Sequence, residues 1–306
     1  MPRLKILDWY THQGHQYEFF KGEHDFYLAG LKGRKPKWNR EHRPLNSNVK
    51  IIDDRIAAKM KFDVVIIRSP IPKEVYYPHI KRGAVPIAVV QTTNPFPIPK
   101  ETRYTVWNSV EVMKKYKSAM PESKHRYIVH GYDPDEFYML PDTRRNGKVL
   151  TVANVFKKRS KIMGFPLWHA VSKKVKKLDV IGHGNLDLYP RDRQAKNLKS
   201  LIRTYNIYSV YFNPTHSSAM PRSRAEAAMC GMPIVSTDNY DINRYFKHNK
   251  SSILTNDPGK MISGINQLLA NDSMRRDYGM SAREVAIKHF HIDDFLGKWN
   301  RIFEDL

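Results

Sequence analysis

The stretch HSSAMPRSRAEAAMCGMPIVSTDNYD, residues 216–241, dominates the second half of the chain. It passes from a polar segment through a Pro-Arg turn into a run of small residues, crosses Gly231 and enters the apolar run 233–235. Small residues, a glycine and an apolar run in this order predict a loop, a helix, a turn and a buried strand. Glu226 then lies about one turn inside the helix, which needs an explanation.

Apolar runs alternate with helical patterns along the rest of the chain. Such alternation predicts parallel sheets built from βαβ units, and therefore an α/β protein with two facing, doubly wound, Rossmann-like domains. The polar connector 141–148 separates residues 1–141 from residues 148–288, and a last helix, 289–306, is expected to pack back on the first domain. Strands are expected within 4–10, 62–70, 85–93, 104–109, 125–134, 149–156, 178–184, 209–214 and 232–237.

The composition is globular but strongly basic. The chain has 306 residues, of which 41% are hydrophobic, and its 52 Lys and Arg residues exceed 30 Asp and Glu residues to give a net charge of +22. Such an excess favours an anionic partner: a nucleic acid, an anionic membrane surface or a phosphorylated small molecule. The single cysteine and the lack of a membrane span or signal sequence indicate a cytoplasmic protein, which leaves room for peripheral attachment to a membrane.

The turn before the predicted helix has the residues of an anion site. Ser217 or Ser218 suits the cap and Pro221 the first helical turn, where free backbone N–H groups attract phosphate. Glu226 cannot share that place with a phosphate, but it can accept hydrogen bonds from sugar hydroxyls beside one. The alternative is that Glu226 only offsets the helix dipole.

Together these segments resemble the GT-B glycosyltransferases of the family 4 type. PRSRAEAAMCGMPIVSTD resembles the family's carboxy-terminal signature, VLTVAN and LDVIGHGN resemble two of its nucleotide-domain strands, and residues 251–290 resemble its helical tail. The resemblance covers about residues 148–300, and VWNS at 106–109 and HGYDPDEF at 130–137 extend it more loosely. It implies a nucleotide-sugar donor in the second domain and an acceptor in the first.

The resemblance assigns the donor residues. It implies that Glu226 binds the nucleotide ribose, that transfer retains the anomeric configuration and that neither a cofactor nor a metal is needed. The implied donor set is Gly14, Asn154, Arg159, Lys161, Gly182, His183, His216, Ser218, Met220, Pro221, Arg222 and Glu226.

The sequence departs from the family pattern in two places, at one position in the first and at a pair of positions in the second. Ser218 stands where a second glutamate is usual, and Asn154 and Arg159 stand where Arg and Lys normally clamp the diphosphate. We expect Arg159 to take that role because its planar guanidinium matches phosphate oxygens, with Lys161 second. The DPD motif at 133–135 suggests a metal site, but Asp and Pro are ordinary turn residues, so we interpret it as a turn.

The loop HQGHQ, residues 12–16, follows the first strand. Gly14 would allow a ligand to approach the backbone, and His15 could orient a hydroxyl or accept its proton. With Arg159 and Lys161, His15 completes the candidate catalytic set, although a histidine in a loop is often structural.

The first domain carries a basic loop that suits the acceptor. Residues 31–44 interleave cations with an aromatic residue, as needed for phosphate tracking and base stacking, so a modified base in DNA is slightly favoured. An anionic membrane with a lipid-linked or cell-envelope glycan is the rival, and a non-catalytic nucleic-acid-binding protein on a degenerate scaffold is the alternative of another class. The candidate acceptor residues are Lys32, Arg34, Lys35, Lys37, Trp38 and Arg40.

Overall fold

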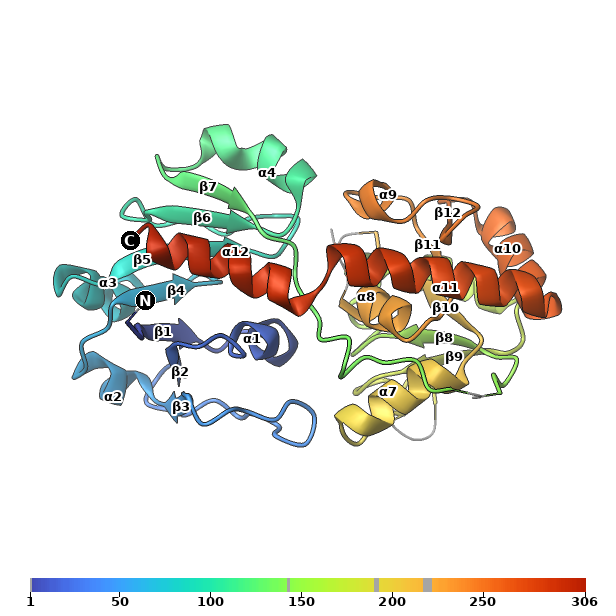
Figure 1. Cartoon of the computed structure of the whole chain (residues 1–306), viewed down its shortest axis with the longest axis horizontal. Helices are drawn as coiled ribbons and strands as arrows, with labels where there is room; N and C mark the ends of the chain where they lie inside the picture. The colour runs from blue at the N-terminus through green and yellow to red at the C-terminus, as the bar shows by residue number, and fades with distance from the viewer. Residues whose placement is uncertain (1, 142–143, 190–192, 217–221) are drawn as a thin grey trace. The chain divides into compact units, whose positions relative to one another are not determined.

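Two parallel sheets form the framework of the chain (Figure 1). The computed structural model describes residues 2–141, 144–189, 193–216 and 222–306. They divide into two compact units: unit 1, Met1–Gly131 with Ile292–Leu306, and unit 2, Tyr132–His291. The α/β class and the two Rossmann-like domains predicted from the sequence are therefore confirmed.

Unit 1 is built on a seven-stranded sheet in the order β3-β2-β1-β4-β5-β6-β7, all parallel. Its strands are β1 Lys5–Trp9, β2 Asp25–Ala29, β3 Val49–Ile52, β4 Val64–Ile67, β5 Val85–Val90, β6 Tyr104–Trp107 and β7 Lys124–Tyr127. The helices between them are α1 Gln13–Phe19, α2 Asp54–Ala58, α3 Lys73–Lys81 and α4 Val110–Tyr116, followed by the short 3-10 turn Lys117–Ala119. The strands β2 and β3 were not expected from the sequence.

Alternate residues of each central strand of unit 1 point to opposite faces of the sheet. Ile6 and Val64 belong to a core that includes α12, Ile292–Glu304, whereas Leu7 and Val65 belong to a second core against α2 and α3. Because side chains alternate along a strand, a sheet covered on both faces needs apolar residues throughout. This explains the near-continuous apolar run around β4.

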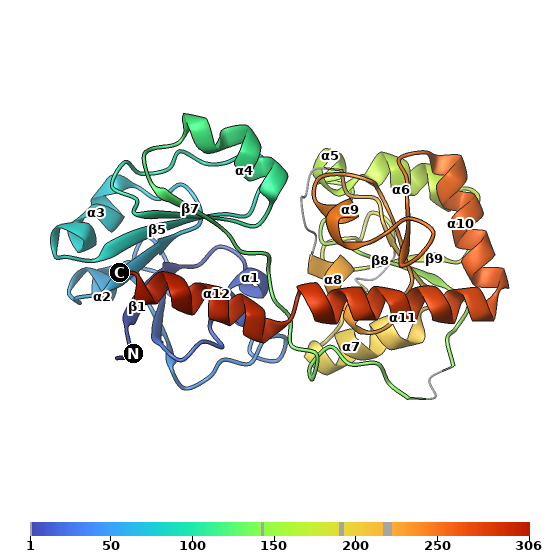
Figure 2. The same ribbon diagram turned by 45° about the horizontal axis from the view of Figure 1, so that its top comes forward.

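Helix α12 completes unit 1 although it comes from the far end of the chain (red in Figures 1 and 2). Its buried residues Ile292, Phe295, Trp299, Ile302 and Phe303 follow helical spacing and form one apolar stripe. They pack in the same core as the strands β1, β4 and β5. The end of the helix is fastened by Asp305, which accepts a hydrogen bond from Tyr104 and pairs with Lys124 at 2.8 Å.

Unit 2 has a five-stranded parallel sheet in the order β12-β11-β10-β8-β9. Its strands are β8 Val149–Val152, β9 Leu178–Ile181, β10 Val210–Asn213, β11 Ile234–Ser236 and β12 Ser252–Leu254. The helices are α5 Ser160–Met163, α6 Phe165–Ser172, α7 Leu198–Ile207, α8 Arg222–Met229, α9 Ile242–Tyr245, α10 Pro258–Ala270 and α11 Asp272–His289. One core joins the sheet to α6 and α10, and α8 packs on α11.

The boundary between the units differs from the predicted one. Residues 132–140 cluster with unit 2 rather than with the first domain, because their backbone is held by α7 and α11. Asn206 donates to the carbonyl of Tyr138 and accepts from the amide of Leu140, and Arg283 donates to the carbonyl of Phe137. Composition marks a polar linker, but it gives no sign of these contacts.

Each sheet has a point where the strand order reverses. In unit 1 this switch point lies between β1 and β4, and in unit 2 it lies between β8 and β10. Ligands of open α/β sheets bind outside the carboxyl ends of the strands at such points. The loops after these four strands are therefore the places to examine. In the described part of the chain no helix is both long and apolar enough to cross a bilayer.

His79 of α3 makes the stability of unit 1 depend on pH. Its ring is 3% exposed, lies against Trp9 and Phe62, and contacts Arg82 at 3.0 Å. Burial first, and then the charge of Arg82, lower the pKa of His79 to about 4. Since the unfolded chain takes up this proton at a higher pH than the folded chain, stability is lost as the pH falls from about 6.5 toward 4.

We expect the free energy of unfolding to fall by about 2–3 kcal/mol between pH 7.5 and 4.5 through this group alone. His79→Gln should remove that part of the dependence in urea titrations at the two pH values. The exposed His169 provides the control, and His169→Gln should leave the dependence unchanged. If the free energy of unfolding changes equally between the two pH values in wild type and in His79→Gln, the prediction is contradicted.

Candidate functional site

The loops that follow β8 and β9 are locked together at the carboxyl edge of the unit 2 sheet. Asn185 lies at the centre of this lock: its amide donates to the carbonyls of Ala153 and Gly182 at 2.8 and 3.0 Å, and its oxygen accepts from the N–H of Phe156. The predicted donor residue Asn154 takes part, because its side-chain oxygen accepts from the N–H of His183 at 3.0 Å. These bonds fix the shape of the edge beside the switch point.

Backbone strain marks the same place. Val155 has a φ of 51°, although a β-branched residue rarely adopts the left-handed region. The neighbouring Gly182 has a φ of 151°, and a Cβ there would lie 2.1 Å from the carbonyl oxygen of Ala153. Strained residues of this kind cluster where a loop must keep one shape to bind a ligand. Gly182 therefore serves first to let the two loops approach.

Glu226 of α8 is held in a buried network. It is 3% exposed, accepts a hydrogen bond from the hydroxyl of Tyr205 at 2.9 Å and pairs with Arg222 at 2.9 Å. Burial first, and then the carboxylate of Glu226, raise the pKa of Tyr205 well above its ordinary value, so the phenol remains a donor. The Arg222 guanidinium also lies over the ring of Tyr132 at 5.3 Å. The carboxylate is thus fixed in one orientation on the helix that follows β10.

The other predicted donor residues are distributed around this edge. Arg159 comes immediately before α5, where its backbone N–H donates to the carbonyl of Val155, and its side chain is exposed, as is that of Lys161. Neither side chain has an ion pair with another described residue. His183 and His216 are exposed in the loops after β9 and β10. The predicted residues Ser218, Met220 and Pro221 lie outside the described residues.

A buried ion pair joins the two strands that flank the switch point of unit 1. Asp8 of β1 is 0% exposed and accepts from Arg68, which follows β4, at 2.9 Å. Burial raises the pKa of Asp8, and the charge of Arg68 partly opposes that shift. The Arg68 guanidinium also lies over the ring of Phe19 at 4.8 Å. Neither residue of the pair was expected to matter from the sequence.

Residues 13–16 lie in the helix α1, and only His12 precedes it, so most of the segment 12–16 is not the loop predicted from its glycine. The side chain of Gln16 accepts from the N–H groups of Thr11 and His12 at 3.0 and 3.3 Å and donates to the carbonyl of Trp9. Gln16 lies inside α1 and binds the backbone just before the helix, which begins at Gln13. Gly14 is therefore the second residue of α1. Glycine weakens a helix interior only slightly, and the Gln16 cap outweighs that preference here.

His15 lies in a cluster of three imidazoles and belongs to α1, which follows β1, one of the two strands that flank the switch point of unit 1. Its ring centroid is 4.8 Å from that of His12 and 5.3 Å from that of His130, which follows β7. His130 is 7% exposed and packs on Phe295 of α12. Through this cluster His15, whose helix follows β1, contacts His130, which follows β7. His130 was not expected from the sequence because its neighbours indicate only a strand end.

The basic loop, residues 32–40, follows β2 and is anchored at its first residues. The backbone N–H groups of Lys32 and Gly33 donate to the two carboxylate oxygens of Asp54, at 2.9 and 2.7 Å. Five cations of the loop are exposed and have no ion pair with another described residue: Lys32, Arg34, Lys35, Lys37 and Arg40.

Trp38 is the exception in this loop. Its indole donates to the carbonyl of Arg43 at 2.6 Å and packs on the core near Phe20 and Tyr10. Trp38 is half-buried and its indole N–H holds the loop on unit 1, and the prediction that the ring offers a face for base stacking stays a prediction. Alternation of cations with an aromatic residue in the sequence cannot distinguish an anchor from a platform.

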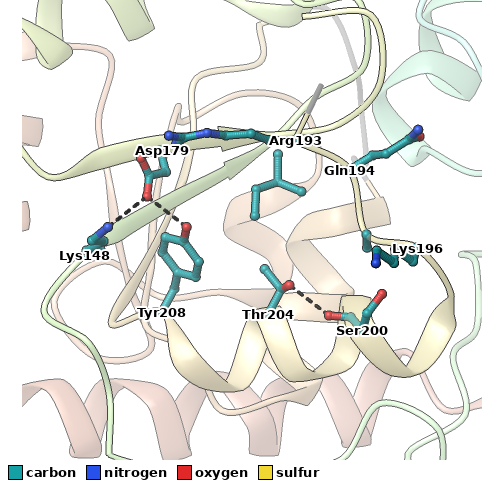
Figure 3. A pocket seen from close by; sticks show the side chains of 10 residues that line it. Lys148, Asp179, Arg193, Gln194, Lys196, Ser200, Thr204 and Tyr208 are labelled. Carbon is teal, nitrogen blue, oxygen red and sulfur yellow. Dashed lines mark hydrogen bonds and ion pairs between the residues drawn. The ribbon is translucent and has the colours of Figure 1, made fainter. Parts of the chain in front are cut away.

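A cavity of about 470 Å³ lies between the edge strand β9, residues 193–196 and α7 (Figure 3). Asp179 is the hub of one end of it: Tyr208 donates to its carboxylate at 2.8 Å, Arg193 at 2.9 Å, and Lys148 lies at 3.6 Å. Burial and this hydrogen bond raise the pKa of Tyr208. Among the residues that the structure describes, no predicted donor residue lines this cavity.

The DPD motif is a turn. The side chain of Asp133 accepts from the N–H of Asp135 at 3.0 Å, and its carbonyl accepts from the N–H of Glu136. Across the described ranges there is no group of three or more His, Cys, Asp or Glu residues arranged to hold a metal ion.

Comparison with known proteins agrees with this geometry. Residues 166–299 match the family model described as glycosyl transferase-like. A glycosyltransferase from Rickettsia africae superposes with a TM-score of 0.73 at 14% identity, covering 100% of this chain and 99% of that one. HepE of Anabaena, in complex with UDP and glucose, superposes with a TM-score of 0.74 at 11% identity, covering 99% and 100% of the two chains. No curated protein matches in sequence.

The chain has the GT-B glycosyltransferase fold. Sucrose-phosphate synthase from Thermosynechococcus elongatus has it too, with a TM-score of 0.72 at 11% identity and 99% of both chains covered. At these identities the likeness establishes the fold, and the chemistry must come from the residues. Within the GT-B fold of this chain, the buried glutamate of α8 and the locked loops after β8 and β9 occupy the switch-point edge of unit 2.

Proposed function

We propose that the protein is a glycosyltransferase that takes a sugar from a nucleotide sugar bound by unit 2. The observation that carries this proposal is Glu226, fixed by Tyr205 and Arg222 on the helix that follows β10. A carboxylate held beside a switch point is suited to accept hydrogen bonds from ribose hydroxyls, as acidic residues do in dinucleotide folds. The strained, locked loop after β8 provides a preformed wall beside it.

The cations of unit 2 suit a diphosphate leaving group. Negative charge develops on the nucleotide diphosphate as it departs, and fixed cations near it lower the barrier. Arg159 and Lys161 are exposed after β8 and have no competing ion pair with another described residue. We assign them to the diphosphate, with transfer independent of a metal and with retention at the anomeric carbon. HepE binds UDP and glucose, which makes a UDP-sugar the first donor to test.

His15 is the candidate for the acceptor hydroxyl. Its ring contacts those of His12 and His130, and its helix follows β1, which flanks the switch point of unit 1, where a ligand of this sheet would lie. An imidazole can orient a hydroxyl or accept its proton near neutral pH. His15 is therefore proposed to act on the acceptor, and Gly14 next to it to permit close approach.

The donor half of the proposal has a direct test. A panel of nucleotide sugars is incubated with the protein in EDTA, and release of nucleotide and sugar is followed by mass spectrometry. We expect hydrolysis of one donor, a UDP-sugar first, with the released sugar initially in the donor's anomeric form by NMR. Binding of nucleic acid without hydrolysis or binding of any donor would favour the non-catalytic alternative.

We propose that the acceptor is a polyanion, or is held on one, and that nucleic acid is the first class to test. The five cations of the basic loop lack ion-pair partners among the described residues and stand together after β2. Phosphates neutralised by Lys and Arg release condensed counterions, so affinity for duplex DNA should fall linearly with salt on logarithmic axes. Measuring the affinity for duplex DNA at several salt concentrations therefore tests the acceptor proposal.

Neutralising Lys32, Arg34, Lys35 and Lys37 with glutamine should flatten the salt dependence of DNA binding by about three units or more in slope. Fluorescence anisotropy at several salt concentrations measures it. A matched control neutralises four cations of α6–β9 and α7, Lys173, Lys174, Lys176 and Lys199, which are exposed in unit 2. An equal change in slope for both variants would contradict a specific role of the basic loop.

An anionic membrane is the second candidate surface, and one observation favours it. Tyr10 and Leu31, which follow β1 and β2 beside the basic loop, are 37% and 36% exposed. Exposed apolar side chains next to cations suit a lipid headgroup region. Vesicle sedimentation with anionic lipid distinguishes the two: tight vesicle binding without DNA binding at low salt would favour a lipid-linked acceptor.

A further inference from the structure

The first turn of α8 has an unusual charge pattern. Arg222 and Arg224 both lie in it, and it contains no acidic residue. Backbone N–H groups make the start of a helix positive, so cations there are unfavourable and anions are favoured. An α8 with two arginines at its positive end therefore needs negative charge from another source.

Glu226 supplies that charge to Arg222 but not to Arg224. Arg222 pairs with Glu226 at 2.9 Å, and the other oxygen of Glu226 accepts from Tyr205. Side chains two positions apart on a helix do not face each other, so Arg224 points away from this pair. The two arginines thus have different surroundings although they share one turn.

Arg224 carries a buried guanidinium that has no polar partner in the part of the chain that the structure describes. The residue is 0% exposed, and its Nε, Nη1 and Nη2 have no hydrogen-bond partner among the described residues. Burial lowers the pKa of Arg224 to about 10, and the phenols of Tyr211 and Tyr132 partly oppose that shift. The side chain is therefore still charged at neutral pH. A buried charge normally has a partner, because leaving water is costly.

We expect the guanidinium of Arg224 to lean toward the start of α8. Helical side chains lean toward the N-terminus of their helix, and Arg224 is only its third residue. Helix α8 follows β10, which flanks the switch point of unit 2. The unpartnered cation and the positive end of the helix therefore reinforce each other at the edge where a nucleotide is proposed to bind.

We propose that Arg224 is a fixed counter-charge for the diphosphate of the nucleotide-sugar donor. This inference rests on the proposed function and adds a residue to it. Arg159 and Lys161 are exposed and screened by water, whereas a charge in a poorly hydrated interior acts more strongly on an anion nearby. Arg224 therefore discriminates a nucleoside diphosphate from the same nucleoside with fewer phosphates.

The proposal predicts opposite effects on binding and on stability. Arg224→Met removes an unpaired buried charge and keeps much of the apolar volume, so the melting temperature of the ligand-free protein should rise. Affinity for UDP should fall on the order of 10- to 100-fold, as for loss of a charged interaction, while affinity for uridine should not change. A side chain needed only for folding would give a lower melting temperature and weaken both ligands together.

The test uses the full chain with calorimetric titration of UDP, UMP and uridine and thermal unfolding without ligand. Arg224→Lys keeps the charge, so its affinity for UDP should lie between the affinities of wild type and Arg224→Met. The exposed Arg203 of α7 provides the matched control, and Arg203→Met should match wild type in every measurement.

Two results would separate the inference from the function it rests on. If wild type binds UDP and Arg224→Met binds it equally well, the role of Arg224 is overturned and the donor site stands. If wild type binds none of the three ligands, the UDP-sugar function itself is overturned. A lower melting temperature of Arg224→Met with parallel loss of UDP and uridine would assign Arg224 to folding and also overturn the inference.

Discussion

Replacement of Glu226 with alanine is expected to lower the free energy of unfolding by about 3–5 kcal/mol. The substitution removes the carboxylate that pairs with Arg222 and accepts from Tyr205, both of which are mostly buried. It leaves the guanidinium and the phenol without this partner, and an uncompensated buried charge costs more than the pair itself contributes. Urea unfolding followed by circular dichroism measures the loss.

Two variants separate the network from a general effect of losing a glutamate. Glu284 of α11 is exposed, so Glu284→Ala should change stability by less than about 0.5 kcal/mol. Glu226→Gln keeps the shape of the side chain and should fold, but it should weaken binding of the donor by about 1.5–3 kcal/mol through loss of the charged acceptor. A loss below about 1 kcal/mol for Glu226→Ala would show that the buried network contributes little.

The Asp8–Arg68 pair should give a comparably large effect in unit 1. Asp8→Ala leaves the Arg68 guanidinium buried without its carboxylate, and we expect it to destabilise the protein by about 3–5 kcal/mol. The double substitution Asp8→Leu with Arg68→Met removes both charges together and should cost far less than Asp8→Ala. Urea unfolding of the single and double variants measures the difference.

The comparison also tests what the pair does at the switch point. If the double variant keeps its stability but loses acceptor use at unchanged donor affinity, the pair positions β1 and the helix α1 that carries His15. Additive losses in the two single variants, Asp8→Leu and Arg68→Met, would mean that the charges do not interact and would contradict the prediction.

The sequence predicts the architecture well because strand and helix signals repeat in a consistent order. Buried strands such as β4 and β8 are near-continuous apolar runs, and the small-residue run around Glu226 is the helix α8. The strands β2 and β3 escape notice because they are short and are preceded by polar, charged segments. Their pairing partners are set by the sheet, which a single segment does not reveal.

The candidate site is less visible in the sequence because its connections are made between distant residues. Asp8 within β1 suggests a solvent-facing charge until Arg68, from another strand, is beside it. Arg224 within a small-residue helix likewise suggests an exposed cation, whereas the fold buries it. Trp38 is the converse case, because its indole is committed to the backbone of Arg43. The surroundings of each of these side chains are decided by tertiary packing rather than by the neighbouring residues in the sequence.

The discontinuous make-up of unit 1 has a consequence for how the chain is synthesised. Ribosomes release a chain from its amino end, and domains generally fold as their residues become available. All of Tyr132–His291 emerges before Ile292–Leu306, which supplies Phe295, Trp299 and Phe303 to the core of unit 1. Unit 2 can therefore finish folding first, while the earlier-made strands of unit 1 wait with an aromatic face uncovered. A nascent chain stalled before residue 292 should be a preferred client of chaperones that bind exposed apolar surface.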